Sequence, residues 1–242
     1  MKRHINTLVL SVTSIIIVLL VTGTFLNRHK PSQKIFVTGL GSKDFKSDLI
    51  VWSGSFSKQS EELSTAYDLI KKDQVIIEDY LSNKGVNRDE IAFSAVSINK
   101  EFESIYHEGK YVRQEFTGYR LSQYVTIESY KVDEIEQLSR DITEIINEGV
   151  EFYSNSPNYY YTKLAELKIE MVAAATEDAR VRAEQIADKS KAELGNLKHA
   201  QMGIFQIIAQ NSNDDYSWGG TYNTTSKMKS ATITMRLQFG ID

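Results

Sequence analysis

The chain has 242 residues, of which 41% are hydrophobic and 25% are charged, and this composition is typical of a folded globular domain. It contains no cysteine, which excludes disulfides, thiolate metal sites, cysteine nucleophiles and a lipoprotein anchor. The formal net charge is −4, and no acidic residue precedes Asp44. Because an acidic domain repels phosphate backbones, we expect no nucleic-acid partner.

The N-terminal segment is hydrophobic and carries no charge from Ile5 to Asn27. A helix over residues 5–26, rising about 1.5 Å per residue, is long enough to cross the roughly 30 Å hydrocarbon core of a bilayer. Lys2 and Arg3 precede the run, as in a signal sequence or an N-in anchor, although basic residues at 28 and 30 weaken the orientation argument.

We therefore expect residues 1–27 to be a signal anchor in the lipid bilayer or a signal peptide cleaved near 21–23, with a buried core helix as the third alternative. An anchor predicts a single-pass cell-membrane protein whose domain lies in the periplasm or otherwise outside the cytoplasm. A cleaved signal predicts a secreted or periplasmic protein. Residues 28–33 are a polar linker, and the folded domain is expected over 34–242.

The first half of this domain alternates between strand and helix patterns. Strands are predicted over 35–40 and 49–56, followed by a helix that begins with Ser60 as its cap and ends at Gly85. Two further strands, 91–98 and 119–127, flank a charged hairpin around residues 108–110.

A second helix is predicted from the spacing of Asp133 and Glu136, which is that of a capping box, and it closes at Gly149 before a strand from 150 to 153. The order from 49 to 161 is therefore β-α-β-β-α-β, the ferredoxin-like pattern. A stripe from Leu164 to Leu194 that includes three alanines, at 175, 179 and 183, predicts one long helix.

Two closing strands are expected over 201–209 and 231–239, and the first is apolar on both faces, as in a central strand or a subunit contact. The predicted fold class is thus α+β: an antiparallel sheet with a ferredoxin-like core, a long C-terminal helix and two closing strands, behind one N-terminal hydrophobic helix.

The long helix and the strand after it carry a family resemblance. The run from Lys163 to Ile207 has a Lys-Leu start, an Ala-Ala-Thr-x-Asp-Ala-Arg centre at 174–180, a Leu-Gly end at 194–195 and a Gly-x-Phe-x-Ile strand at 203–207. In these features the chain resembles the SIMPL-domain (YggE-like) family over residues 35–239. The resemblance implies an exported or membrane-tethered α+β protein of unknown biochemical activity. It also implies a link to envelope or oxidative stress for some members and ring-like oligomers for at least some.

Four patterns that suggest a chemical site have simpler interpretations. Gly39-Leu40-Gly41 has no third glycine opening a helix, so we interpret it as a strand-end turn. A metal site of His107 with the acids at 101, 103 and 108 is interpreted as a solvated hairpin tip. Asp178 and Arg182, four residues apart, predict an ion pair on the helix. No Gly-x-Ser-x-Gly elbow is present. We expect no enzyme and no catalytic, cofactor-binding or metal-binding residues.

Aromatic residues give the remaining candidates. Tyr159, Tyr160 and Tyr161 are interpreted as an amphipathic edge of the core rather than a binding platform. The polar segment from 210 to 229 is unusually long for a loop, and its Tyr216, Trp218 and Tyr222 are a candidate contact loop, with a variable connector as the alternative.

The leading functional hypothesis is an envelope-facing, membrane-tethered interaction module that forms a homo-oligomer or binds another envelope protein. A small-molecule binding protein with a pocket between helices and sheet is the alternative. An uncharacterised hydrolase is the third hypothesis, and the usual nucleophile, metal and phosphate-loop signals are missing from the sequence.

Overall fold

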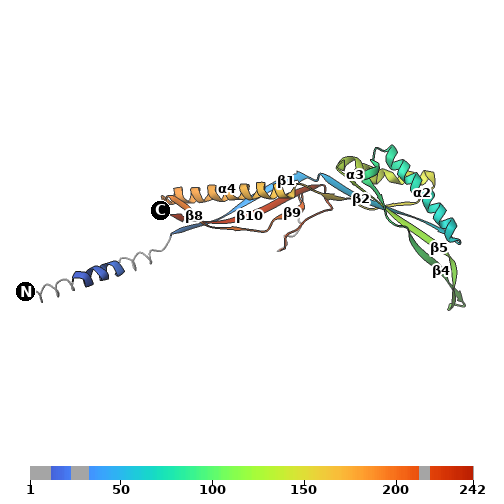
Figure 1. Cartoon of the computed structure of the whole chain (residues 1–242), viewed down its shortest axis with the longest axis horizontal. Coiled ribbons are helices and arrows are strands. Elements are labelled where there is room, and N and C mark those ends of the chain that lie inside the picture. Colours follow the sequence, from blue (N-terminus) through green and yellow to red (C-terminus); the bar gives the residue numbers. More distant parts are fainter. Residues whose placement is uncertain (1–11, 23–32, 213–218, 242) are drawn as a thin grey trace, which may run out of the picture. The chain divides into compact units, whose positions relative to one another are not determined.

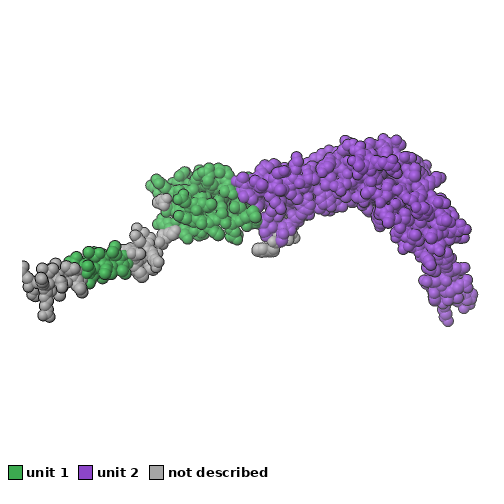
Figure 2. All heavy atoms as spheres, viewed as in Figure 1, with its two compact units in different colours: residues 1–40, 174–203, 234–242 green, residues 41–173, 204–233 purple. Residues whose placement is uncertain are grey.

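The computed structural model describes residues 12–22, 33–212 and 219–241. The chain divides into two compact units, shown in Figure 2. Unit 1 comprises residues 1–40, 174–203 and 234–242, and unit 2 comprises residues 41–173 and 204–233. Three long elements contribute residues to both units: β1 (Lys34–Lys46), α4 (Leu164–Ser190) and β10 (Met228–Ile241).

Unit 2 contains most of the secondary structure (Figure 1). Its elements are β2 (Leu49–Ser60), α2 (Leu63–Asn83), the 3-10 turn η1 (Arg88–Glu90), β3 (Ile91–Phe93), β4 (Ser97–His107), β5 (Lys110–Ser129), α3 (Val132–Asp141), η2 (Ile142–Glu148), β6 (Phe152–Ser154), β7 (Asn158–Tyr160) and β9 (Gln206–Ala209). The sheet order is β3-β5-β2-β6, with β4 also on β5 and β7 also on β2. Every one of these pairings is antiparallel. This is the predicted ferredoxin-like order.

The core of unit 2 lies between one face of this sheet and the two helices. Alternate residues of the two central strands face the helices, as the twofold period of a strand requires. On β2 these are Ile50, Trp52 and Phe56, and on β5 they are Leu121, Val125 and Ile127, all at most 1% exposed. The helices contribute Ala66, Ile70, Ile77 and Leu81 from α2 and Ile135 and Leu138 from α3.

Unit 1 is a helix packed on one face of three strands, in the order β1-β10-β8, where β8 is Leu194–Met202. Its helical part is the second half of α4, whose alanines at 175, 179 and 183 are completely buried. A Cβ at Gly39 of β1 would lie 2.1 Å from the Ala175 carbonyl oxygen and 2.7 Å from the Ala179 Cβ. Only glycine opposite alanine permits this close approach, so the predicted alanine stripe is confirmed as a packing surface.

Three local predictions were wrong. Gly39 lies inside β1 and is not a strand-end turn. The absence of a side chain at Gly39 makes room for α4. Helix α2 begins after Glu62, so Ser60 is not its N-cap. Helix α3 begins after Lys131, whose side chain makes no cap, and Asp133 bonds lysines at 46 and 227 instead of closing a capping box.

The closing strands also differ from the prediction. The region 201–209 is not one strand: β8 starts at Leu194, and a break at 203–205 separates it from β9. At the break the Gly203 N–H donates to the Thr234 carbonyl over 2.8 Å. β8 is an edge strand of its sheet and not a central strand. Helix α4 ends at Ser190, before β8 starts, and is therefore shorter than the helix to Leu194 that the stripe predicted.

Within the predicted anchor, residues 12–22 form a helix. Among the described helices, none has both the length and the apolar character needed to span a membrane. The rest of the predicted run, at 5–11 and 23–26, lies outside the described residues. The membrane segment therefore stays a prediction.

The packing of α4 on β1 predicts that Ala179→Leu destabilises the protein. The added carbons have to enter the space between the helix and Gly39, and overpacking of this kind costs about 1–3 kcal/mol. Chemical denaturation measures the change in the free energy of unfolding. Val181→Leu, at a position of α4 that is 44% exposed, is the matched control and should leave this free energy nearly unchanged. Equal effects of the two substitutions would contradict the packing described here.

Candidate functional site

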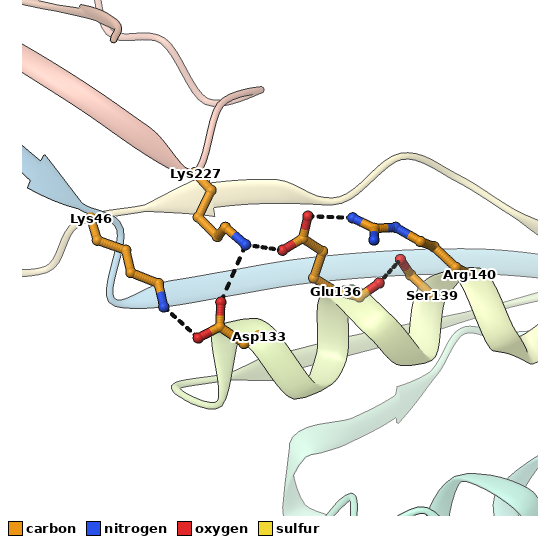
Figure 3. Close-up of polar contacts among 6 residues, drawn as sticks. All are labelled: Lys46, Asp133, Glu136, Ser139, Arg140 and Lys227. Atoms are coloured by element: carbon orange, nitrogen blue, oxygen red, sulfur yellow. Dashed lines mark hydrogen bonds and ion pairs between the residues drawn. The ribbon is translucent and has the colours of Figure 1, made fainter.

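A cluster of charged side chains surrounds the start of α3 in unit 2, and Figure 3 shows it. Asp133 bonds the ammonium groups of both Lys46 and Lys227. Lys227 also bonds Glu136, which receives a second bond from Arg140 over 2.6 Å. Helix α3 thus binds lysines from β1 and from the segment before β10 through its first two turns.

The electrostatics of this cluster keep each group in its ordinary charged form. Hydrogen bonds from Lys46 and Lys227 lower the pKa of Asp133, and the bond from Lys227 lowers that of Glu136. The same contact with Glu136 raises the pKa of Lys227. A general acid or base working near neutral pH needs a shift in the opposite sense, so this cluster is suited to holding segments together rather than to proton transfer.

An open pocket of about 580 Å³ lies beside the cluster. It is lined by Lys46, Ser47, Asp48, Tyr130, Lys131, Val132, Asp133, Glu134, Thr162 and Lys163. The Asp48 carboxylate accepts from the N–H and the hydroxyl of Thr162, both over 2.8 Å. Ser47 is 2% exposed, and its Oγ has no hydrogen-bond partner among the described residues. Most of the lining residues are polar or charged, and the pocket is of a size that accommodates a small molecule.

A second unusual group is Lys229 on β10, whose side chain is completely buried. Its Nζ donates to the carbonyl oxygens of Asn223 and Ser226 over 2.5 and 2.6 Å. Burial lowers the pKa of this amine from 10.5 to about 8. Because no substrate can reach a fully buried amine, Lys229 clamps the segment 223–226 rather than acting as a nucleophile.

A group of exposed aromatic side chains lies on the ribbon formed by β4 and the first half of β5. Register pairs place Phe102 opposite Phe116 and Tyr106 opposite Tyr111. These pairs are edge-to-face with ring centroids 5.7 Å and 6.1 Å apart, and Phe116 also packs edge-to-face against Tyr119 at 5.1 Å. We call these five residues the aromatic row.

The aromatic row lies on the same face of the sheet as the core. Tyr119 packs against the core cluster, and Leu121, the next inward residue of β5, is buried. Beyond Tyr119 no helix in the described part of unit 2 covers the sheet face, and Figure 1 shows this end of β4 and β5 extending past α2. The other four rings are consequently 44–64% exposed.

A comparison with known protein families matches residues 35–238 to SIMPL, described as a protein of unknown function (DUF541). The chain belongs to the SIMPL family. The resemblance drawn from the sequence is thereby confirmed. A comparison with curated proteins finds no significant match. Membership in this family does not assign a biochemical activity to the chain, because the family is described as of unknown function.

The predicted contact loop of the SIMPL chain is only partly described. Tyr216 and Trp218 lie outside the described residues. Tyr222 is held against unit 2: its hydroxyl accepts from the Tyr161 N–H over 3.2 Å and its ring is 6.5 Å from that of Tyr160. The backbone on both sides of Tyr222 bonds Ile207, so the second half of this segment is part of the fold. A contact role for the loop stays a prediction.

The other predicted residues are now placed. Tyr159 is 6% exposed and belongs to the core cluster, which confirms the edge-of-core interpretation. Asp178 and Arg182 form the predicted ion pair at 2.9 Å, and Asp178 also accepts from the Leu40 N–H. No group of three or more metal-ligating side chains occurs within the described ranges. The Glu101 carboxylate of the proposed metal set bonds Arg120 over 2.8 Å.

Sequence reasoning missed the aromatic row. The interpretation of residues 101–110 as a charged tip rested on their glutamates and lysines, which occupy other positions of the ribbon. The signal was present in the strand period: Ile98, Phe102 and Tyr106 recur at even spacing along β4, as the inward residues of a covered strand do.

The buried amine predicts a distinctive pH dependence of stability. Because burial depresses the pKa of Lys229 in the folded state, the unfolded state binds more protons between about pH 8 and 10.5. Stability from this group therefore rises with pH across that window, by up to about 1.4 kcal/mol per pH unit. The free energy of unfolding of the wild type relative to Lys229→Met should increase accordingly.

Lys227→Met is the matched control for that experiment. The pKa of Lys227 is raised in the folded state, so its contribution to stability is present below the unfolded pKa and decreases as the pH rises through the folded value. The two lysines should thus give opposite slopes against pH. If the difference in the free energy of unfolding between wild type and Lys229→Met did not change with pH, the ammonium of Lys229 would be solvated in the folded state.

Proposed function

We propose that this SIMPL chain is a membrane-tethered, envelope-facing interaction module that self-associates through the aromatic row of the β4–β5 ribbon. The observation that carries the proposal is the exposure of Phe102, Tyr106, Tyr111 and Phe116 on the face of the sheet that is core elsewhere. Contiguous apolar surface of this kind marks contact sites in soluble domains.

The chemistry of the ribbon favours a second copy of the chain as its partner. Aromatic side chains are the usual anchors of interfaces, because they bury a large area with few rotatable bonds. The row runs along the ribbon and includes two edge-to-face pairs, so two copies related by a twofold axis can place one row against the other.

The charges of the ribbon do not select a differently charged partner. Arg113 pairs with Glu115 at 3.4 Å, and Arg120 pairs with Glu101 at 2.8 Å. These ion pairs neutralise one another within the ribbon. Apolar contact is therefore the attraction that the ribbon offers, which suits association between identical rows.

The tether in this proposal is the apolar run 5–26. It is supported by the absence of charge from Ile5 to Asn27 and by the helix over 12–22, whose large apolar side chains are 47–66% exposed. A chain with such a segment at its start is exported in the proposed arrangement, and the ribbon then faces other envelope components.

The proposed role needs no catalytic residue. Two features of the site support this: the carboxylates at the start of α3 are ion-paired, and the amine whose pKa lies near 8 is buried. A second candidate function is the binding of a small polar molecule in the pocket beside α3. It is favoured by the buried hydroxyl of Ser47 at the wall of that pocket.

The aromatic row predicts that Phe102→Ser with Phe116→Ser weakens self-association. Each change removes a ring from the centre of the proposed interface, where such truncations cost about 2 kcal/mol or more of binding. Light scattering coupled to size-exclusion chromatography of the full chain in detergent should show a shift from a multimer to smaller species.

The matched control is Tyr124→Ser with Tyr153→Ser. These two rings are 55% and 57% exposed, and both lie opposite Ser55 on the other face of the same sheet. The control removes two exposed rings and should leave the assembly state unchanged. A wild-type chain that is monomeric at all concentrations would contradict self-association, and equal losses in both double variants would contradict the assignment to the row.

A further inference from the structure

No helix of the described ranges 33–212 and 219–241 covers one of the two sheet faces of unit 1. Helix α4 covers the face to which Ile35, Val37 and Gly39 point. The alternate residues Lys34, Phe36 and Thr38 therefore point to the other face, and all three are exposed. Phe36 is 71% exposed, which is unusual for a ring within a strand.

Within the described residues of unit 1, the uncovered face carries basic and no acidic residues. In register with each other, β10 and β8 contribute the pairs Arg236–Gln201 and Gln238–His199 to it. The described acids of unit 1 are Glu177, Asp178, Glu184 and Asp188 on α4 and Glu193 after its end. The described strand residues within unit 1 include no acid, and Asp44 of β1 belongs to unit 2. No ion pair joins Lys34 or Arg236 to an acid anywhere in the described part of the chain.

A groove of about 300 Å³ crosses this face. Its walls include Phe36, Thr38, His199, Gln201, Arg236 and Gln238. The groove thus combines one exposed ring, one unpaired guanidinium and several hydrogen-bond donors. This combination suits an anionic headgroup whose phosphate meets Arg236 while an apolar chain lies beside Phe36.

The position of this face in the chain points to the same ligand. The uncharged stretch that contains the apolar run ends at Asn27, and β1 begins seven residues later at Lys34. Seven residues reach at most about 25 Å, so a run embedded in a bilayer holds the start of β1 near the headgroups. Arg28 and Lys30 add positive charge to this short connection.

We propose that the uncovered sheet face of unit 1 docks on the surface of a bilayer that contains anionic phospholipid. Lys34, His199 and Arg236 face the headgroup phosphates, and Phe36 enters the boundary between headgroups and acyl chains. The inference rests on the proposed tether, because a short tether gives the face a high effective concentration at the membrane. Attraction of basic residues to an anionic leaflet supplies the selectivity.

The experiment uses full-length protein with Thr38→Cys, labelled with a polarity-sensitive fluorophore, because the wild-type chain has no cysteine. The protein is reconstituted with vesicles of phosphatidylcholine, with or without phosphatidylglycerol. We expect blue-shifted emission and reduced quenching by iodide only with phosphatidylglycerol, and reversal at high salt. The same label at Gln185→Cys, an exposed position of α4, should stay aqueous with both lipids.

Charge variants test which residues are responsible. Lys34→Glu with Arg236→Glu should abolish the blue shift, and the milder Lys34→Gln with Arg236→Gln should reduce it. Lys189→Glu with Lys191→Glu changes the net charge by the same amount away from the sheet and should preserve it. Circular dichroism establishes that each variant is folded. An equal blue shift of the emission in all variants would overturn the proposal.

Flotation of the same samples separates this inference from the tether. If the protein floats with both lipids and the label at position 38 shows no blue shift, the tether is supported and the docking face is overturned. Protein that floats only with phosphatidylglycerol overturns the tether and supports the face. Protein that floats with neither overturns both. A blue shift that depends on protein concentration and not on lipid would mean that a second copy covers the face, which also overturns the proposal.

Discussion

The structure of unit 2 depends on the ladder between β2 and β5. It runs without interruption from the pair Ile50–Ser129 to the pair Ser60–Tyr119. One face of this ladder forms the core with α2 and α3, and both flanks receive the shorter strands. β5 begins at Lys110, however, so its first residues have only β4 as a partner. The face that is core beside α2 therefore continues past the helix as the aromatic row.

Unit 1 follows the same physical rule with different residues. A helix can cover only one face of a sheet, and here the choice of face is made by the close contact of Gly39 with α4. On β1 the strand period then fixes Lys34 and Phe36 on the opposite face. The two uncovered faces differ in chemistry: the one on the ribbon is aromatic and locally neutral, and the one in unit 1 is basic. They accordingly suit different partners.

The sequence predicted the features that depend on period and order. Burial alternates along β5 and β10 as expected, and the β-α-β-β-α-β order gave the correct sheet. Features that depend on distant partners were not predictable. Asp133 has the spacing of a capping box, yet lysines from β1 and from before β10 bind its carboxylate. The role of Gly39 requires knowledge of which alanines face it. The aromatic row was hidden because its rings alternate with charged residues on the ribbon.

The most direct test of the account is site-specific photo-cross-linking of the full chain in a membrane. A benzoylphenylalanine replaces Phe102 in the aromatic row, or Tyr124 on the opposite face as control, and mass spectrometry identifies the cross-linked peptides. The account predicts a covalent dimer from position 102 whose second peptide comes from residues 97–119 of another copy, and no dimer from position 124. Dimers of equal yield from both positions, or none from position 102, would contradict it.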